Sequence, residues 1–376
     1  MKKLVFSAAA LTAASAAFAN ESDWAQLDQD IQALSASLQG LEGTGMTIGG
    51  RIRAGYENSG DITGSFNTAP GPDAILGTPD DVITPGNDLG GFALYNARLF
   101  AAGTTGQDIG YRIEIDFAQA GLLDAYLDIP VGNEITVRTG RFRGHVLRES
   151  LIDSGDLLFF DRSATAALFS ARRTGVAAVG NFEAFEWAVT IQNGGDGVGD
   201  DLFYAVRAGI DILGEGTDLV EGAYGASEEM EASAGVAYFN DDATEDADGF
   251  AVEGSLATNQ FSANATIVSL GDAAIGSQLE NNERMIVPMP IAGDSTIFSV
   301  GGSFMLTEAS SEYGAGELAA RYQDFDDPGD STLIDVGANY YAHGHDMKYI
   351  INVTSGSSDG GGLDGTLVRV GVQSRF

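Results

Sequence analysis

Apolar and polar residues alternate with a period of two from about residue 46 to the end of the chain. In YRIEIDF, residues 111–117, the aromatic and isoleucine side chains share one face and the charged side chains share the other. This pattern predicts β-strands with one apolar and one polar face. Sixteen such segments occur, near residues 46–56, 92–103, 110–118, 122–129, 134–141, 173–180, 184–192, 203–212, 230–239, 249–258, 260–268, 296–306, 312–323, 333–342, 346–354 and 365–376.

Two all-β architectures satisfy this alternation: a two-layer soluble sandwich, and a barrel whose apolar face meets lipid while its polar face lines a wet lumen. Aromatic residues at the ends of the apolar faces favour the barrel, as does the aromatic last residue, Phe376. Tight turns alternate with long acidic connections such as 57–91, 213–229 and 269–295, which we expect at the outer end. We predict a sixteen-stranded antiparallel transmembrane β-barrel, wide enough to enclose an aqueous channel.

The first 43 residues follow different patterns. Residues 1–19 contain two lysines, an alanine-rich apolar stretch and an Ala-Phe-Ala motif, which predicts a signal peptide and export. In residues 20–43, apolar side chains recur at heptad spacing. This favours a short periplasmic coiled-coil helix supported by an oligomer; an amphipathic helix packed on its own domain is the alternative. Residues 44–376 would then be the outer-membrane barrel.

Composition excludes several classes of function. The formal net charge of −35 argues against nucleic acid as a partner, because binding it requires a basic surface. The absence of cysteine removes disulfides and thiolate metal sites. None of His145, His343 and His345 lies in a recognisable nucleophile context, so we expect no enzyme. A zinc site at His343 and His345 would lack a third nearby ligand.

Several segments resemble the phosphate-selective porin O/P family. They are the ARL strand opening and DF…LLDAYLD hairpin in residues 97–129, the GRF, RES…D…FFDRS and RRTG motifs in residues 137–181, and WAVTIQNGG, residues 187–195. The resemblance implies a trimeric sixteen-stranded porin whose third loop, here about residues 142–171, folds into the lumen. The family's phosphate channels are lined by basic residues, many of them lysines. After the signal peptide this chain has one lysine, Lys348, so phosphate selectivity does not follow from the resemblance alone.

Arginines concentrate around the same loop. Residues 138–173 contain seven arginines and four acidic residues, a local charge of +3 in a strongly acidic chain. Guanidinium groups stay charged at any working pH, so they suit a permanent positive wall, and facing carboxylates would create a transverse field. Alternatively, the arginines pair with loop acids and fasten the loop, as Arg162 beside Asp161 indicates. The candidate constriction residues are Arg138, Arg141, Arg143, Arg148, Arg172, Arg173, Glu149, Asp153 and Asp156.

One acidic loop could hold a cation. Asp73, Asp80, Asp81 and Asp88 surround a glycine turn, and such oxygen-rich loops can bind Ca²⁺. A structural calcium is therefore one interpretation, and a solvated acidic loop is the other.

These observations predict a homotrimeric porin in the lipid of the bacterial outer membrane, a passive diffusion channel for small hydrophilic solutes and ions with an arginine-rich eyelet. An anion-selective porin that prefers phosphate is the alternative, because nearby fixed charges outweigh charges beyond a Debye length of about 8–10 Å. A soluble exported β-protein that binds calcium or sugar is the rival class, and the need for detergent in extraction separates it from a barrel.

Overall fold

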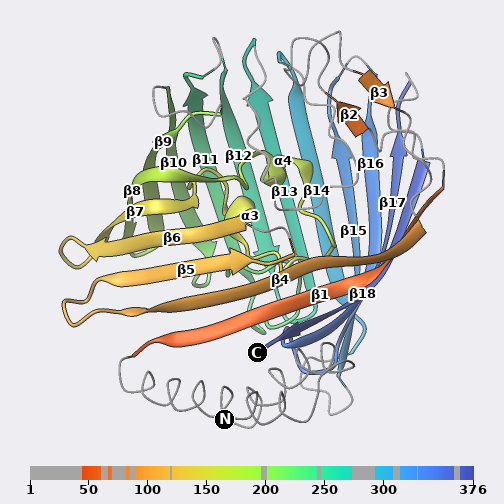
Figure 1. Ribbon diagram of the computed structural model, residues 1–376, viewed down its shortest axis with the longest axis horizontal. Coiled ribbons are helices and arrows are strands. Elements are labelled where there is room, and N and C mark those ends of the chain that lie inside the picture. Colours follow the sequence, from red (N-terminus) through yellow and green to blue (C-terminus); the bar gives the residue numbers. More distant parts are fainter. Residues whose placement is uncertain are drawn as a thin grey trace, which may run out of the picture.

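The computed structural model describes residues 45–60, 67–69, 82–84, 90–118, 121–195, 201–243, 247–272, 293–307, 314–327, 329–359 and 365–376. Sixteen of its strands form a closed antiparallel barrel in which β1 pairs with β18 (Figure 1). The strands are β1 (Thr47–Gly60), β4 (Gly90–Thr104), β5 (Gly110–Asp116), β6 (Gly121–Pro130), β7 (Ile135–Arg143), β8 (Arg172–Phe182), β9 (Phe185–Asn193), β10 (Leu202–Leu213), β11 (Glu231–Asp241), β12 (Asp248–Ala257), β13 (Phe261–Leu270), β14 (Thr296–Met305), β15 (Ala315–Asp324), β16 (Thr332–Tyr341), β17 (Met347–Ser357) and β18 (Gly365–Arg375).

The predicted closed barrel and its sixteen strand segments are confirmed. Two further short strands, β2 (Asn67–Ala69) and β3 (Val82–Thr84), pair with each other outside the barrel sheet. The predicted signal peptide and coiled coil lie outside the described residues, and so do the four aspartates of the proposed calcium loop. Within the described residues, no helix combines the length and apolar character needed to cross a membrane.

The alternation places apolar side chains outside and polar side chains inside. In β18, Val370 is 48% exposed, whereas its neighbour Arg369 is 1% exposed. The same arrangement occurs in β15, where the apolar Leu318 is exposed and the charged Glu317 is buried. A water-soluble protein buries the opposite set, so this arrangement suits a barrel surrounded by lipid.

The direction of the strands assigns each connection to one end of the barrel. The chain enters β1 and leaves β18 at the same end, which we call the carboxyl-terminal end. An even number of barrel strands precedes the connection 214–230, so it lies at the carboxyl-terminal end. The prediction that grouped residues 213–229 with the long outer connections 57–91 and 269–295 is therefore wrong. Its length was a poor guide because, as shown below, this segment folds into the lumen.

Candidate functional site

The connection between β7 and β8, residues 144–171, folds into the barrel, and we call it the inner loop. It carries two short helices, α3 (Arg148–Leu151) and α4 (Ala164–Leu168), which lie inside the barrel in Figure 1. Ser163 begins α4, and its hydroxyl accepts a hydrogen bond from the backbone N–H of Ala166 at 3.1 Å. This cap satisfies one of the free N–H groups at the helix start.

Inward polar side chains of β15–β18 bind the backbone of the inner loop. Lys348 Nζ donates to the carbonyl oxygens of Leu157 and Gly155 at 2.7 and 3.3 Å, and Asn339 donates to the Leu158 carbonyl at 2.9 Å. Further contacts come from Arg321 to the Asp161 carbonyl, from Gln323 to the Ala164 N–H, and from Arg369 to the Asp161 carboxylate. Buried loop backbone needs such partners. The inner loop therefore fills the lumen along these strands.

Apolar contacts extend the filled part to β11–β14. Phe169 at the end of the inner loop packs edge-on against Phe239 of β11, with ring centroids 4.8 Å apart. Leu168 and Phe169 belong to a buried apolar cluster that also contains Phe203 and Val268. The lumen along β12–β17 is thus largely filled. The open space lies on the side of β1 and β4–β10, with Ser233 of β11 and Arg375 of β18 at its edges.

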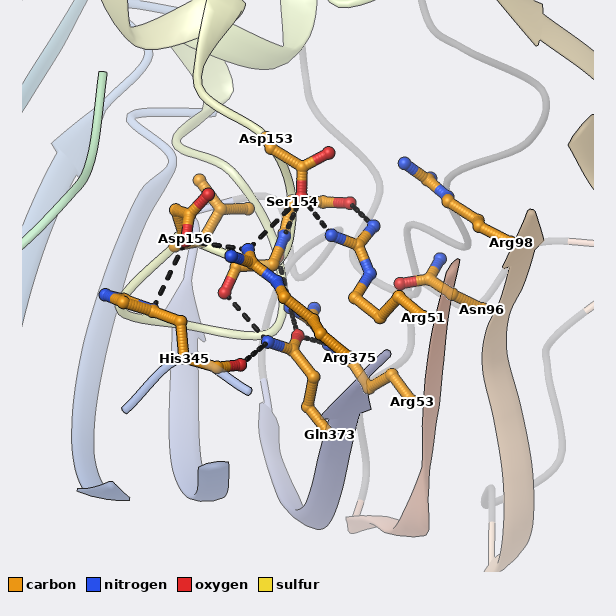
Figure 2. Close-up of polar contacts among 12 residues, drawn as sticks. Arg51, Arg53, Asn96, Arg98, Asp153, Ser154, Asp156, His345, Gln373 and Arg375 are labelled. Carbon is orange, nitrogen blue, oxygen red and sulfur yellow. Dashed lines mark hydrogen bonds and ion pairs between the residues drawn. The ribbon is translucent and has the colours of Figure 1, made fainter. Parts of the chain in front are cut away.

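Three arginines lie side by side on the inner wall at β18, β1 and β4 (Figure 2). In the strand register, Arg51 is directly opposite Arg375 on β18 and directly opposite Arg98 on β4. Like charges in this arrangement repel. Asp153 of the inner loop forms ion pairs with Arg51 and, at 3.5 Å, with Arg375, while Asp116 binds Arg98 at 2.9 Å. Carboxylates on both sides therefore compensate the arginine row.

The neighbouring loop carboxylate, Asp156, completes this contact. It binds Arg375 at 2.6 Å and lies 3.2 Å from Nδ1 of His345, in the turn before β17 (Figure 2). Ser154, between the two aspartates, accepts a hydrogen bond from Arg51 at 2.6 Å. Asp153, Ser154 and Asp156 thus hold the inner loop against the wall through charged hydrogen bonds, which are the stronger class.

Burial and neighbouring charges shift the pKa values of several inner-loop groups. Burial raises the pKa of Asp153, but Arg51, Arg98 and Arg375 outweigh it and hold that pKa well below its ordinary value. Burial, together with the nearby Glu221 carboxylate, raises the pKa of Glu149 to about 7. Burial lowers the pKa of His145 to about 4, and Arg138 and Arg207 lower it further in the same direction. Burial therefore favours the neutral form of both Glu149 and His145.

The open part of the lumen is a cavity of about 1050 Å³ along β1 and β4–β10. Its lining contains nine arginines and eight acidic side chains. The arginines are Arg51, Arg98, Arg112, Arg138, Arg143, Arg148, Arg172, Arg207 and Arg375, and the acids are Glu114, Asp124, Asp153, Asp156, Glu186, Asp211, Glu215 and Asp346. Eight of these arginines lie on strands, whereas four of the acids lie on connecting segments. The wall is therefore richer in positive charge than the segments that face it.

The wall arginines are held by carboxylates and rings. Arg138 binds Asp128 through two hydrogen bonds of 2.7 and 2.8 Å, and its guanidinium lies 4.0 Å from the ring centroid of Tyr126. Arg172 binds Asp124 at 2.7 Å, and Arg207 binds Glu186 and Glu253. This pairing fixes the guanidinium groups and reduces their net field in the cavity.

Six of the predicted constriction residues line this cavity: Arg138, Arg143, Arg148, Arg172, Asp153 and Asp156. Three do not line it: Arg141, Arg173 and Glu149. Arg141 points away, and its Nε donates to the Leu122 carbonyl at 3.0 Å. Arg173 binds Asp241 and the Asn193 carbonyl, and Glu149 is buried beside Thr266. Arg141 is an odd number of residues from inward-facing Arg138, as alternation requires of an outward side chain. Arg143, the last residue of β7, departs from this alternation and lines the cavity.

Both interpretations of the arginines, lining and fastening, apply, and some residues combine the two. Arg143 does both, because it lines the cavity and donates to the carbonyl oxygens of Ser150 and Ile152. Arg162 contacts the Glu149 carbonyl and is not part of the cavity lining, so it acts as a fastener. Among the described residues, no group of three or more histidine and acidic side chains is arranged to hold a metal ion.

The prediction missed five arginines that line the cavity from other strands: Arg51, Arg98, Arg112, Arg207 and Arg375. Each occupies a polar-face position in its strand, so the alternation carried the signal. The local density of arginine around residues 138–173 drew the prediction to one part of the chain.

Comparisons with known proteins agree with this architecture. The family model described as phosphate-selective porin O and P matches residues 84–266, just under half of the chain, which confirms the resemblance predicted from the sequence. Among curated proteins, no sequence matches this chain.

The fold is similar to that of solved channel structures. An anion-selective porin from Comamonas acidovorans is 15% identical with a TM-score of 0.55, over 89% of this chain and 100% of that chain. The outer-membrane channel DcaP of Acinetobacter baumannii is also 15% identical with a TM-score of 0.54, over 88% of this chain and 97% of that chain. At 15% identity, this similarity shows that the structures share a fold.

Proposed function

We infer, from the family match over residues 84–266 and the closed sixteen-stranded barrel, that this chain is a porin: a passive diffusion channel for small hydrophilic solutes and ions. The observation that carries this function is the charged cavity along β1 and β4–β10 inside a barrel with an apolar outer face. We place the protein in the bacterial outer membrane, as a homotrimer, in accordance with the family resemblance. We assign it no catalytic role.

The inner loop narrows this channel and makes its cross-section uneven. Arginines dominate the strand side of the cavity, and Asp153 and Asp156 lie on the loop side. A charged wall opposite carboxylates orients dipolar solutes as they pass. A phosphate- or anion-selective porin is the second candidate, favoured by the eight lining arginines on strands. The carboxylate partners of Arg51, Arg138 and Arg172 favour the less selective channel.

The test is reconstitution of detergent-extracted protein in a planar bilayer, with the zero-current potential measured under a KCl gradient. We expect discrete channels, extraction only with detergent, and a gel shift on boiling. A clear anion preference would establish the second candidate. Water-soluble protein that forms no channels would overturn the porin assignment.

A further inference from the structure

The connection 214–230 between β10 and β11, which we call the inner segment, enters the lumen from the carboxyl-terminal end and meets the inner loop. The backbone N–H of Glu221 donates to the Asp156 carbonyl at 3.0 Å, and the Glu221 carboxylate accepts from the N–H of Leu158 at 2.8 Å. The N–H of Ala223 donates to the inward Glu317 of β15 at 2.6 Å. The two elements are thus joined inside the barrel by one backbone hydrogen bond and one from a backbone N–H to the Glu221 carboxylate.

Contacts at both ends of the inner segment fix its position. Arg148 of the inner loop donates to the carbonyl oxygens of Thr217 and Val220 at 3.2 and 3.4 Å. Tyr224 stacks on Tyr341 of β16 with ring centroids 4.0 Å apart. Between them, Gly222 has a φ of +100°, and a Cβ there would lie 2.7 Å from the Glu317 carboxylate. Only glycine suits this close approach.

The inner segment supplies three residues to the cavity lining: Glu215, Thr217 and Leu219. Glu215 is exposed, and among the described residues it has no hydrogen-bond or ion-pair partner. It follows the end of β10, so it lies toward the carboxyl-terminal mouth. In contrast, the arginines Arg51, Arg98 and Arg172 are buried and paired with carboxylates.

We propose that the inner segment is a second constriction element of the channel, and that Glu215 on it determines selectivity by favouring cations over anions at the carboxyl-terminal mouth. This inference rests on the proposed channel function. An unpaired carboxylate at a narrow passage raises the local cation concentration, whereas paired arginines leave little net field. The effect of one mouth charge grows in dilute salt, because the Debye length increases from about 10 Å at 0.1 M to about 30 Å at 0.01 M.

The experiment compares Glu215→Gln with Glu228→Gln. Glu228 lies in the same segment, is exposed, and is not part of the cavity lining, so it is the matched control. The zero-current potential is measured with the dilute KCl solution on each side in turn. The side is identified from Glu228→Cys and a membrane-impermeant thiol reagent, which has no other target because the chain contains no cysteine.

We expect wild-type channels to favour K⁺ more strongly when dilute salt faces the carboxyl-terminal end. Glu215→Gln should lower the K⁺ to Cl⁻ permeability ratio by about two- to fivefold, as expected for one solvated charge a few ångströms from the ion path. Glu228→Gln should leave the ratio unchanged. In channels of Glu215→Cys, a bulky thiol reagent should reduce the conductance.

The inference would be overturned if the wild type forms channels but Glu215→Gln has an unchanged K⁺ to Cl⁻ permeability ratio. It would also be overturned if the conductance of Glu215→Cys does not respond to the reagent. Both results would leave the channel function intact. Absence of channels in the wild type would overturn the proposed function itself.

Discussion

Asp153 on the inner loop pairs with Arg51 of β1 and Arg375 of β18, two arginines that are register partners on adjacent strands and lie side by side on the inner wall. The loop thus provides the negative charge that lets the wall hold these arginines side by side. Asp116 performs the same task for Arg98, the third member of the row. The constriction and the wall are therefore one electrostatic unit.

Asp153→Asn should weaken this unit. The change leaves Arg51 and Arg375 without their shared carboxylate, so the two arginines repel each other. We expect this to destabilise the loop contact by about 1–3 kcal/mol. The cost is below that of breaking a fully buried ion pair, because Asp153 is 37% exposed. We expect a lower unfolding temperature in detergent and a shift of the zero-current potential toward anions. Asp330→Asn, at an exposed position in the connection between β15 and β16, is the control. Unchanged values of both quantities would contradict the role of Asp153.

Stability should depend on pH through Glu149. Its pKa is raised from an ordinary value near 4.5 to about 7 by burial and by Glu221, so the folded protein holds a proton that the unfolded chain releases. Below pH 4.5 both states are protonated and Glu149 costs the fold nothing. Stability falls as pH rises from about 4.5 to 7, by roughly 3 kcal/mol, because the folded protein must then either keep the proton or bury the charge. Glu149→Gln should be more stable than wild type above pH 7 and equal to it near pH 4. Thermal unfolding of both proteins from pH 4 to 8 measures the difference, and a constant difference would refute the assignment.

His145 should have the opposite effect. Burial, Arg138 and Arg207 lower its pKa from 6.5 to about 4. Between these pH values His145 is protonated in the unfolded chain and neutral in the folded protein. Stability is therefore lost as pH falls from about 6.5 to 4. His145→Gln should flatten this decline by roughly 3 kcal/mol relative to wild type. Part of the acid sensitivity should remain in His145→Gln, because the pKa of His345 is also lowered, to about 3.

The only lysine of the described residues, Lys348, should anchor the inner loop. It is fully buried on β17 and donates to the carbonyl oxygens of Leu157 and Gly155. Lys348→Met leaves the Leu157 carbonyl without this donor, which costs about 1–3 kcal/mol, whereas the Gly155 carbonyl keeps its hydrogen bond from Gln373 at 3.0 Å. We expect noisier open-channel currents and faster protease cleavage within residues 144–171. Lys348→Arg keeps the charge and should retain part of the anchoring. Quiet currents and wild-type cleavage in Lys348→Met would show that the other loop contacts suffice.

The strands were predictable because a lipid-facing barrel imposes a strict period of two on every spanning segment. That period also fixes which face a residue occupies, so Arg51 and Arg375 were recognisable as inward-facing. Their pairing with Asp153 was not, because a strand pattern contains no information on which loop residue reaches it. The position of Glu215 followed from counting strands, but length and acidity suggested the wrong end. Local composition was thus misleading in two places. The acidity of residues 213–229 suggested the wrong end of the barrel, and the density of arginine around residues 138–173 drew Arg141 into the candidate constriction.

Arg138 and Arg141 provide a matched pair for testing which arginines set selectivity. They are three residues apart on β7, but Arg138 lines the cavity whereas Arg141 does not. Arg138→Gln leaves Asp128 uncompensated at the channel wall, so the K⁺ to Cl⁻ permeability ratio should rise by about two- to fivefold. Arg141→Gln removes the same charge from the chain outside the cavity and should leave the ratio unchanged. Equal shifts in the two variants would mean that total charge, rather than the cavity lining, determines selectivity. If neither variant shifted the potential, the arginine wall would be structural, and the acidic residues of the lining would remain as the selective groups.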